Sequence, residues 1–109
     1  MHELAITQSV IDMVSERITE GRVIAVRLEI GRCSGVFSDA VRFCFDLVTE
    51  GTIAEGARLD IEEPPGQARC RDCGGDFEPE AGIPLCPCGS ADVALTGGDQ
   101  LRILSVEVV

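Results

Sequence analysis

Lysine, tryptophan and tyrosine are missing from this sequence of 109 residues, and histidine occurs once. Nine arginines face 19 acidic residues, which gives a formal net charge of −10. Nucleic acids and anionic membrane surfaces would repel such a surface, so we expect neither as a partner. Metal cations, or a protein with a basic face, suit this charge better.

Aromatic side chains are also scarce, since four phenylalanines are the whole set. A core of Val, Ile, Leu and Ala predicts one compact unit of moderate depth, with room for a small metal-stapled appendage. The chain shows neither a signal-peptide pattern nor an apolar run near the roughly 18–20 residues of a membrane span. We therefore expect a cytoplasmic protein. In that reducing compartment we interpret the six cysteines as metal ligands or buried thiols in preference to disulfides.

Two stretches of the first 63 residues have the apolar spacing of amphipathic helices. The first, which ends near Gly21, has an apolar face made of Leu4, Val10, Ile11, Val14 and Ile18. The second runs from an N-cap at Ser38 to a C-cap near Gly51. Its apolar face consists of Val41, Cys44, Phe45 and Val48. Because Cys44 lies on this face, we expect its thiol to be buried and structural.

A predicted strand follows each helix. Residues 23–31 alternate and place on one side Ile24, Val26, Leu28 and Ile30. Residues 57–63 alternate through Leu59 and Ile61. The last nine residues also favour a strand, but their alternation slips at Ile103 and Leu104, which predicts a bulge or burial on both faces. So apolar a strand should not stand free, and we expect it to return to the first sheet.

Residues 64–67, Pro-Pro-Gly-Gln, end the helix and strand pattern and open a segment rich in turn residues. Such a segment buries too little apolar surface to fold alone and needs a cross-link such as a bound metal ion. The predicted fold class is therefore α+β, with two helices packed on a small mixed β-sheet and an inserted zinc-ribbon-like domain. We predict that residues 1–66 plus 100–109 form the α/β domain and that residues 67–99 form the zinc-binding domain.

Four cysteines form two close pairs, Cys70-x-x-Cys73 and Cys86-x-Cys88, separated by 12 residues. Zn²⁺ favours four soft ligands in a tetrahedron, and pairs on facing turns supply them. Binding at such a site contributes about 10–16 kcal/mol, enough to order a loop-rich segment. Two alternatives are reduced surface cysteines and a redox Cys-x-x-Cys motif, although the latter lacks the strand-to-helix context that it needs.

The second pair is tight, because only Pro87 separates its cysteines. Either all four sulfurs bind zinc through a tightened turn, or one position is strained and labile. In the second case Asp72 or Asp76 is the nearest substitute ligand. Cys33 lies outside the cluster, and we assign it no function.

The single histidine is residue 2, next to the amino terminus. The α-amine of Met1, the amide nitrogen of His2 and its imidazole can close adjacent chelate rings around one metal, and Glu3 can add its amide nitrogen or carboxylate. A planar, nitrogen-rich set suits Ni²⁺ or Cu²⁺ better than Zn²⁺. The amine and the imidazole must lose protons to bind, so affinity should fall with pH. The alternative is a terminal histidine without a role.

The whole chain resembles the HypA/HybF family of hydrogenase maturation factors, which act as nickel metallochaperones. The matching features are the opening Met1-His2-Glu3-Leu4, residues 26–31, 42–63, 88–90 and 101–108, and the paired cysteines. The Cys86-Pro87-Cys88 turn departs from the family pattern, which usually has two residues between these cysteines.

The resemblance implies a nickel domain that holds Ni²⁺, the transported metal, through the Met1 amine, His2 and Glu3. It also implies a structural Zn²⁺ site formed by Cys70, Cys73, Cys86 and Cys88. The implied partners are a HypB-type GTPase and the large subunit of [NiFe]-hydrogenase, and a homodimer is possible because some members dimerise. The family is not enzymatic.

Two other functions compete with nickel delivery. A zinc-ribbon adaptor would only mediate protein–protein contacts in metalloenzyme assembly. A thiol- or zinc-dependent enzyme is weaker, because the chain has no second histidine and four thiolates would leave zinc no open coordination position.

Overall fold

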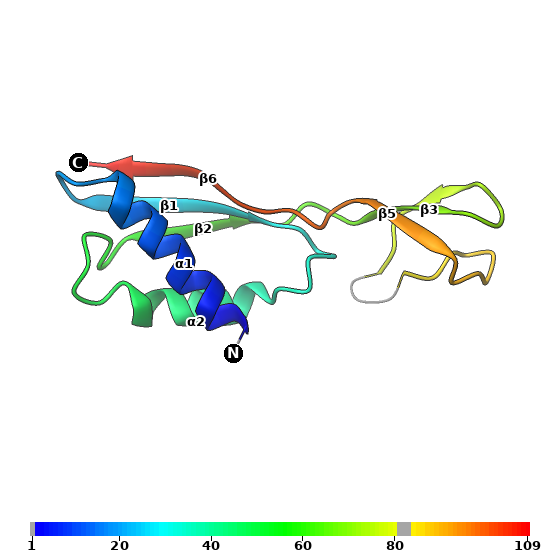
Figure 1. The fold of residues 1–109 in the computed structure, drawn as a ribbon, viewed down its shortest axis with the longest axis horizontal. Helices are drawn as coiled ribbons and strands as arrows, with labels where there is room; N and C mark the ends of the chain where they lie inside the picture. Colours follow the sequence, from blue (N-terminus) through cyan, green and yellow to red (C-terminus); the bar gives the residue numbers. More distant parts are fainter. Residues whose placement is uncertain (1, 81–83) are drawn as a thin grey trace. The chain divides into compact units, whose positions relative to one another are not determined.

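The computed structural model describes residues 2–80 and 84–109. Along the chain the elements are α1 (His2–Arg17), β1 (Val23–Ile30), α2 (Ser38–Val48), β2 (Arg58–Glu62), β3 (Gln67–Cys70), β4 (Asp76–Phe77), β5 (Val93–Gly97) and β6 (Leu101–Val108) (Figure 1). They divide into two compact units. The first unit comprises Met1–Leu28, Val36–Ile61 and Arg102–Val109, and the second comprises Glu29–Gly35 and Glu62–Leu101. Neither α1 nor α2 has the length and apolarity of a membrane span.

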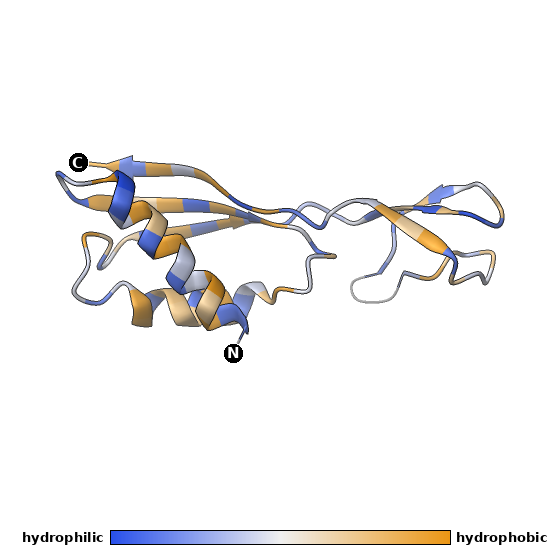
Figure 2. Ribbon diagram, in the orientation of Figure 1, coloured by the Kyte–Doolittle hydropathy of each residue, from blue (hydrophilic) through white to orange (hydrophobic). Residues whose placement is uncertain are grey.

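The first unit contains both helices and a sheet with the strand order β2-β1-β6. The sheet is mixed, since β2 runs in the direction of β1 and β6 runs against it (Figure 1). Apolar residues concentrate along β1 and β6 and in bands on the helices (Figure 2). The core includes Ile11, Val14, Val26, Leu28, Val41, Cys44 and Phe45. This arrangement confirms the predicted α+β fold, the return of the last strand and the buried Cys44 thiol.

The helix ends differ from the sequence prediction at two points. α1 ends at Arg17 rather than near Gly21, which adopts φ +88° in the turn that leads into β1. The N-cap of α2 is Phe37 rather than Ser38, and no side chain caps this end. The N–H of Phe37 donates instead to a carboxylate oxygen of Glu3, 3.2 Å away. A contact with a distant segment therefore sets this helix start, and local sequence rules do not register such contacts.

Burial on α1 and β1 also departs from the simple apolar pattern. Leu4 is 41% exposed, whereas Thr7 is fully buried, with its hydroxyl donating to the carbonyl of Glu3 at 2.7 Å. This i−4 hydrogen bond lets a polar residue occupy the core face. On β1, Ile24 is 42% exposed and Val23 is buried instead. The backbone of Val23 is bonded to the loop after α2, since its N–H donates to the carbonyl of Ile53 at 3.0 Å.

The slip in the alternation of β6 does not come from a bulge. Arg22 and Val109 exchange two backbone hydrogen bonds, and the Gly31 N–H donates to the carbonyl of Gln100. Both strands thus advance equally between these bonds, which leaves no net extra residue. Ile103 and Leu104 are both half-buried, so burial on both faces accounts for the apolar pair.

The second unit is built on an antiparallel sheet with the order β4-β3-β5. Ala68 of β3 lies opposite Phe77 of β4 and Leu95 of β5. Behind these strands three glycines allow close chain crossings: a Cβ on Gly31 would lie 2.1 Å from the carbonyl oxygen of Gly98, and a Cβ on Gly98 would lie 2.4 Å from the Cα of Gly66. Cys33 also packs here, because a Cβ on Gly66 would lie 2.3 Å from its sulfur.

Candidate metal centres

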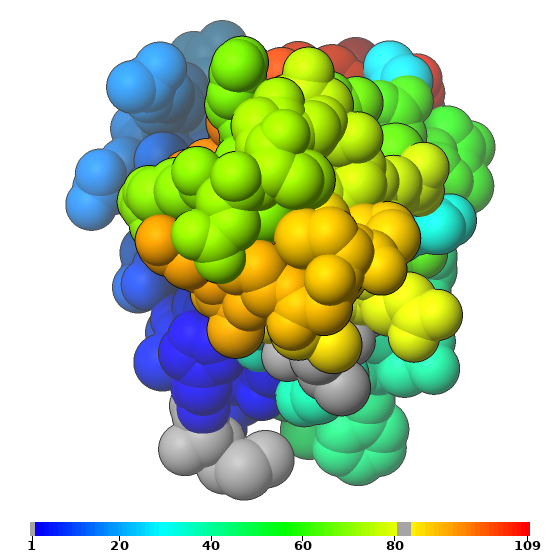
Figure 3. Space-filling model, turned by 90° about the vertical axis from the view of Figure 1, so that its right-hand side faces the viewer, coloured from blue at the N-terminus to red at the C-terminus, as the bar shows by residue number. Residues whose placement is uncertain are grey.

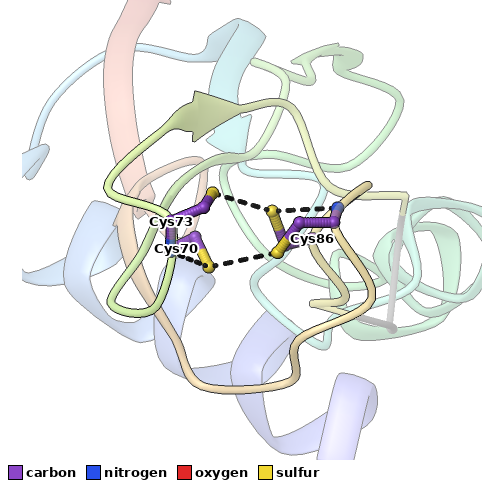
Figure 4. Close-up of side chains that lie close together, drawn as sticks. Cys70, Cys73 and Cys86 are labelled. Carbon is purple, nitrogen blue, oxygen red and sulfur yellow. Dashed lines mark hydrogen bonds between the residues drawn. The ribbon is translucent and has the colours of Figure 1, made fainter.

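The structure brings the four paired cysteines together at one end of the second unit. Cys70 ends β3, and Cys73 lies in the turn that follows. The four sulfur atoms all lie within 4.8 Å of one another. The sulfurs of Cys70 and Cys88 are 3.7 Å apart, as are those of Cys73 and Cys86. Figure 4 shows the side chains of Cys70, Cys73 and Cys86 close together.

Each cysteine pair lies in a turn with the same local hydrogen bonds. In the first turn the Cys73 N–H donates to the sulfur of Cys70 at 3.4 Å, and in the second the Cys88 N–H donates to the sulfur of Cys86 at 3.5 Å. Gly74 and Gly89 follow with φ of +74° and +97°. Glycine adopts this left-handed conformation without the strain of a side chain, so each turn can fold back directly after its second cysteine.

The geometry of the cluster fits zinc. Zn–S bonds of about 2.3 Å in a tetrahedron would separate the sulfurs by roughly 3.8 Å, close to the two distances of 3.7 Å. Cys70 and Cys86 are buried, while Cys73 and Cys88 are exposed. The shorter turn at Pro87 therefore still brings both of its sulfurs to the cluster. Asp72 is engaged elsewhere, because its carboxylate accepts a hydrogen bond from the hydroxyl of Ser90.

The thiols of the cluster ionise unequally. Chiefly because the Cys73 N–H donates to its sulfur, the pKa of Cys70 falls to about 7, although burial opposes this. The Cys88 N–H likewise favours the Cys86 thiolate, but burial and the neighbouring thiols outweigh it and raise the pKa of Cys86 to about 12. Four thiolates this close repel one another, so a soft cation that displaces the remaining protons would relieve the repulsion.

The predicted nickel ligands lie at the start of α1. Met1 falls outside the described residues. The side chain of His2 is 61% exposed, and its Nδ1 atom lies 3.5 Å from Oε2 of Glu3. Glu3 is more enclosed, with its side chain 13% exposed. The imidazole and the carboxylate therefore lie side by side at an accessible end of the first unit.

The carboxylate of Glu3 has a fixed position in the first unit. Its Oε2 atom accepts the N–H of Phe37, which holds the start of α1 against the start of α2. This hydrogen bond is the main reason that the pKa of Glu3 is lowered, and proximity to His2 adds to it. Sequence patterns do not identify Phe37, because a backbone N–H supplies the contact and any residue except proline could provide it.

Comparison with known proteins identifies the family of this chain. The family model described as "Hydrogenase/urease nickel incorporation, metallochaperone, hypA" matches residues 1–108. The chain belongs to the HypA family. Two HypA-family relatives, both named hydrogenase maturation factor HypA, come from Geobacter sulfurreducens and Nostoc punctiforme. The first is 46% identical over 99% of both chains, and the second is 44% identical over 99% of this chain and 96% of its own.

Solved structures of HypA proteins share the fold. The solution structure of the nickel metallochaperone HypA from Helicobacter pylori is 25% identical, with a TM-score of 0.63 over 98% of this chain and 97% of that one. A second HypA solution structure is 27% identical, with a TM-score of 0.65 over 100% of this chain and 97% of that one. The HypA fold therefore extends over both units of the chain.

Proposed function

We propose that this HypA-family chain is a nickel metallochaperone that delivers Ni²⁺ to the large subunit of [NiFe]-hydrogenase during maturation. The observation that carries the proposal is the placement of its one histidine. His2 is exposed in the first turn of α1, beside the carboxylate of Glu3. The names of the family and of its relatives support nickel incorporation and hydrogenase maturation as the context.

The ligand set that we propose for nickel comprises the Met1 amine, the imidazole and amide nitrogen of His2, and Glu3. Amide N–H groups in the first turn of a helix have no intrahelical acceptor. The amides of His2 and Glu3 can therefore bind a metal without the loss of helical hydrogen bonds. Because the Glu3 carboxylate already accepts the Phe37 N–H, we assign it an orienting role and assign ligation to the nitrogen atoms.

We propose a resident zinc ion for the second unit, held by Cys70, Cys73, Cys86 and Cys88. Bound zinc would neutralise part of the thiolate charge and join the two turns. With four protein ligands it would have no open position, so we propose a structural role and no enzymatic activity. Because thiolate ligands persist in a reducing compartment, we propose that the protein works in the cytoplasm.

The two proposed metal sites assign a role to each part of the chain. We propose that residues 1–66 plus 100–109 serve nickel and that residues 67–99 serve zinc. This functional division differs from the two compact units, which group residues 29–35, 62–66 and 100–101 with the cysteine cluster. The formal net charge of −10 favours Ni²⁺ as cargo and partner proteins with a basic face. We propose that a HypB-type GTPase and the hydrogenase large subunit are these partners.

Calorimetry on untagged, zinc-loaded protein tests the nickel site. We expect one Ni²⁺ per chain with a planar nickel spectrum, and we expect both to disappear in His2→Ala and when residues are added before Met1. Glu16→Ala, which removes an exposed acidic residue from the same helix, should bind nickel as the unmodified chain does. Unchanged nickel affinity after either terminal change would contradict the proposal.

A zinc-ribbon adaptor without nickel is the second candidate, and the preassembled cysteine cluster favours it independently of His2. The two functions separate in a host strain that carries His2→Ala. Loss of hydrogenase maturation supports delivery, whereas normal maturation supports the adaptor.

A further inference from the structure

Outside the thiols, a hydrogen bond between the side chains of Asp72 and Ser90 joins the two cysteine turns. Asp72 lies between the cysteines of the first turn, and Ser90 lies two residues after the second turn's last cysteine. The hydroxyl of Ser90 donates to Oδ2 of Asp72. The segments that carry them, drawn in yellow-green and gold, pack directly against each other (Figure 3).

Ser90 also closes its own turn. Its carbonyl accepts the Cys86 N–H at 2.9 Å, and its hydroxyl accepts the Asp92 N–H at 3.1 Å while donating to Asp72. One residue therefore fixes the backbone of Cys86 and connects that backbone to the opposite turn. At the other end of this hydrogen bond, the backbone of Asp72 is part of the turn between Cys70 and Cys73. The bond therefore links the two turns.

A parallel contact supports this connection less strongly. Arg71 forms an ion pair with Asp92 at 2.8 Å, but these side chains are 60% and 57% exposed. Exposed ion pairs contribute little, because water and salt screen them. The Arg71 N–H also donates to the carbonyl of Asp92 at 2.9 Å. The Asp72–Ser90 bond is exposed as well, but the Ser90 hydroxyl is held at the same time by the Asp92 N–H.

The relative orientation of the two turns matters for metal binding because the Cys86-Pro87-Cys88 turn is short. A turn with one residue between its cysteines has fewer backbone conformations that direct both sulfurs to one point. The structure nevertheless places its sulfurs 3.7 Å from those of Cys70 and Cys73. An external contact that holds the end of this turn is therefore needed more here than in a longer turn.

We propose that Asp72 and Ser90 form a latch that positions the Cys86-Pro87-Cys88 turn for zinc. The inference rests on the zinc site proposed above, and it makes Asp72 a positioning residue rather than a ligand. Groups that orient metal ligands typically change metal affinity about 10- to 100-fold when they are removed. Loss of the latch should leave four sulfur ligands in place and let them release zinc sooner.

The test uses full-length, zinc-loaded protein and measures zinc release to an excess of a chromogenic chelator. We expect Ser90→Ala and Asp72→Ala each to release zinc about 10-fold faster. The double variant should release zinc at the rate of Ser90→Ala, which already removes the bond to Asp72 and in addition removes the acceptor of the Asp92 N–H. Ser90→Thr keeps the hydroxyl and should restore slow release. Glu78→Ala removes an exposed carboxylate from the same unit and should release zinc at the unmodified rate, which controls for the loss of charge.

Cobalt-substituted protein separates the latch from direct ligation by Asp72. We expect the sulfur-to-cobalt charge-transfer bands of all latch variants to match those of the unmodified chain. Altered bands in Asp72→Ala alone would make Asp72 a ligand and overturn the latch, as would release from Ser90→Ala at the unmodified rate. Failure of the zinc site itself has a different result, since the unmodified chain would then purify without one zinc per chain.

Discussion

The two candidate metal centres differ in how much of their coordination exists before a metal arrives. In the second unit four sulfurs already lie within 4.8 Å of one another, and two of these cysteines are buried. At the start of α1 the His2 side chain is 61% exposed, and one carboxylate lies beside it. A preassembled set loses little freedom on binding and suits an ion that stays. An open set is accessible to a second protein and suits an ion that leaves.

The same contrast extends to what stabilises each unit. The first unit buries aliphatic side chains from both helices and from β1 around Phe45. Apart from Ile30 at the end of β1, the described part of the second unit buries small apolar residues, Ala68, Cys70 and Cys86. A segment with so little apolar burial depends on cross-links, and two of these three residues belong to the proposed zinc site.

Metal removal should have the largest effect, and it should be confined to the second unit. Zinc at such sites contributes about 10–16 kcal/mol of apparent binding free energy. We therefore expect chelation, or Cys70→Ser, to collapse the dispersion of amide signals from residues 62–101, while signals from α1 and α2 stay in place. A two-dimensional amide NMR spectrum measures both units at once.

Cys44→Ala is the matched control for this experiment. The Cys44 thiol is buried in the first unit, whereas the four clustered cysteines belong to the second, so its removal should leave one zinc per chain. Dispersed signals from the second unit after complete zinc removal would show that its strands fold without metal. The contrast in stabilisation between the units would then be wrong.

A core truncation in the first unit should give the opposite result with a smaller effect. Phe45 is 2% exposed, and Phe→Ala at buried sites costs about 3–5 kcal/mol. We expect Phe45→Ala to lower the stability of the helices by this amount and to leave zinc content unchanged. Guanidinium titration followed by circular dichroism gives the first quantity, and metal analysis gives the second.

Phe43 provides an internal control on the same helix. Its side chain is 70% exposed, so Phe43→Ala should change stability by less than about 0.5 kcal/mol. Equal losses from the two substitutions would contradict the assignment of Phe45 to the core. Loss of zinc in Phe45→Ala would contradict the independence of the two units.

The sequence predicted elements better than it predicted contacts between them. Apolar spacing located both helices, and the β-rich terminus correctly indicated a strand in the first sheet. Spacing failed where a distant group decides the outcome. Thr7 is buried with its hydroxyl bonded to a backbone carbonyl, and Val23 is buried where its N–H bonds the distant carbonyl of Ile53. Neither effect appears in hydrophobicity.

The candidate sites show the same division. The four cysteines could be identified from their pairing, because the ligand atoms are side chains with a diagnostic spacing. The contact between Glu3 and Phe37 could not, since the donor is a backbone N–H of another helix. Ser90 was part of a matched stretch, residues 88–90, yet its link to Asp72 depends on two turns meeting in space.

The smallest expected effect concerns the hydrogen bond between the Phe37 N–H and the Glu3 carboxylate at the start of α1. The Phe37 N–H lowers the pKa of Glu3 below its ordinary value of 4.5. A lowered pKa in the folded state means that this contact stabilises the fold above pH 4.5 and is lost as pH falls through the folded value. In metal-free protein, the Glu3 carboxyl and the Phe37 amide should therefore titrate together, with a midpoint below 4.5, in an NMR pH series.

Glu3→Gln is the control, because it keeps an oxygen acceptor and removes the titration. The Phe37 amide signal should then be flat through this pH range. A Glu3 midpoint at or above 4.5, or a Phe37 amide that titrates identically in Glu3→Gln, would show that the carboxylate is free in solution. Both candidate ligand side chains of the open site would then be unplaced before metal binding. Neither side chain at the start of α1 would then be preassembled, unlike the four cysteines of the cluster, and Glu3 would lose its orienting role.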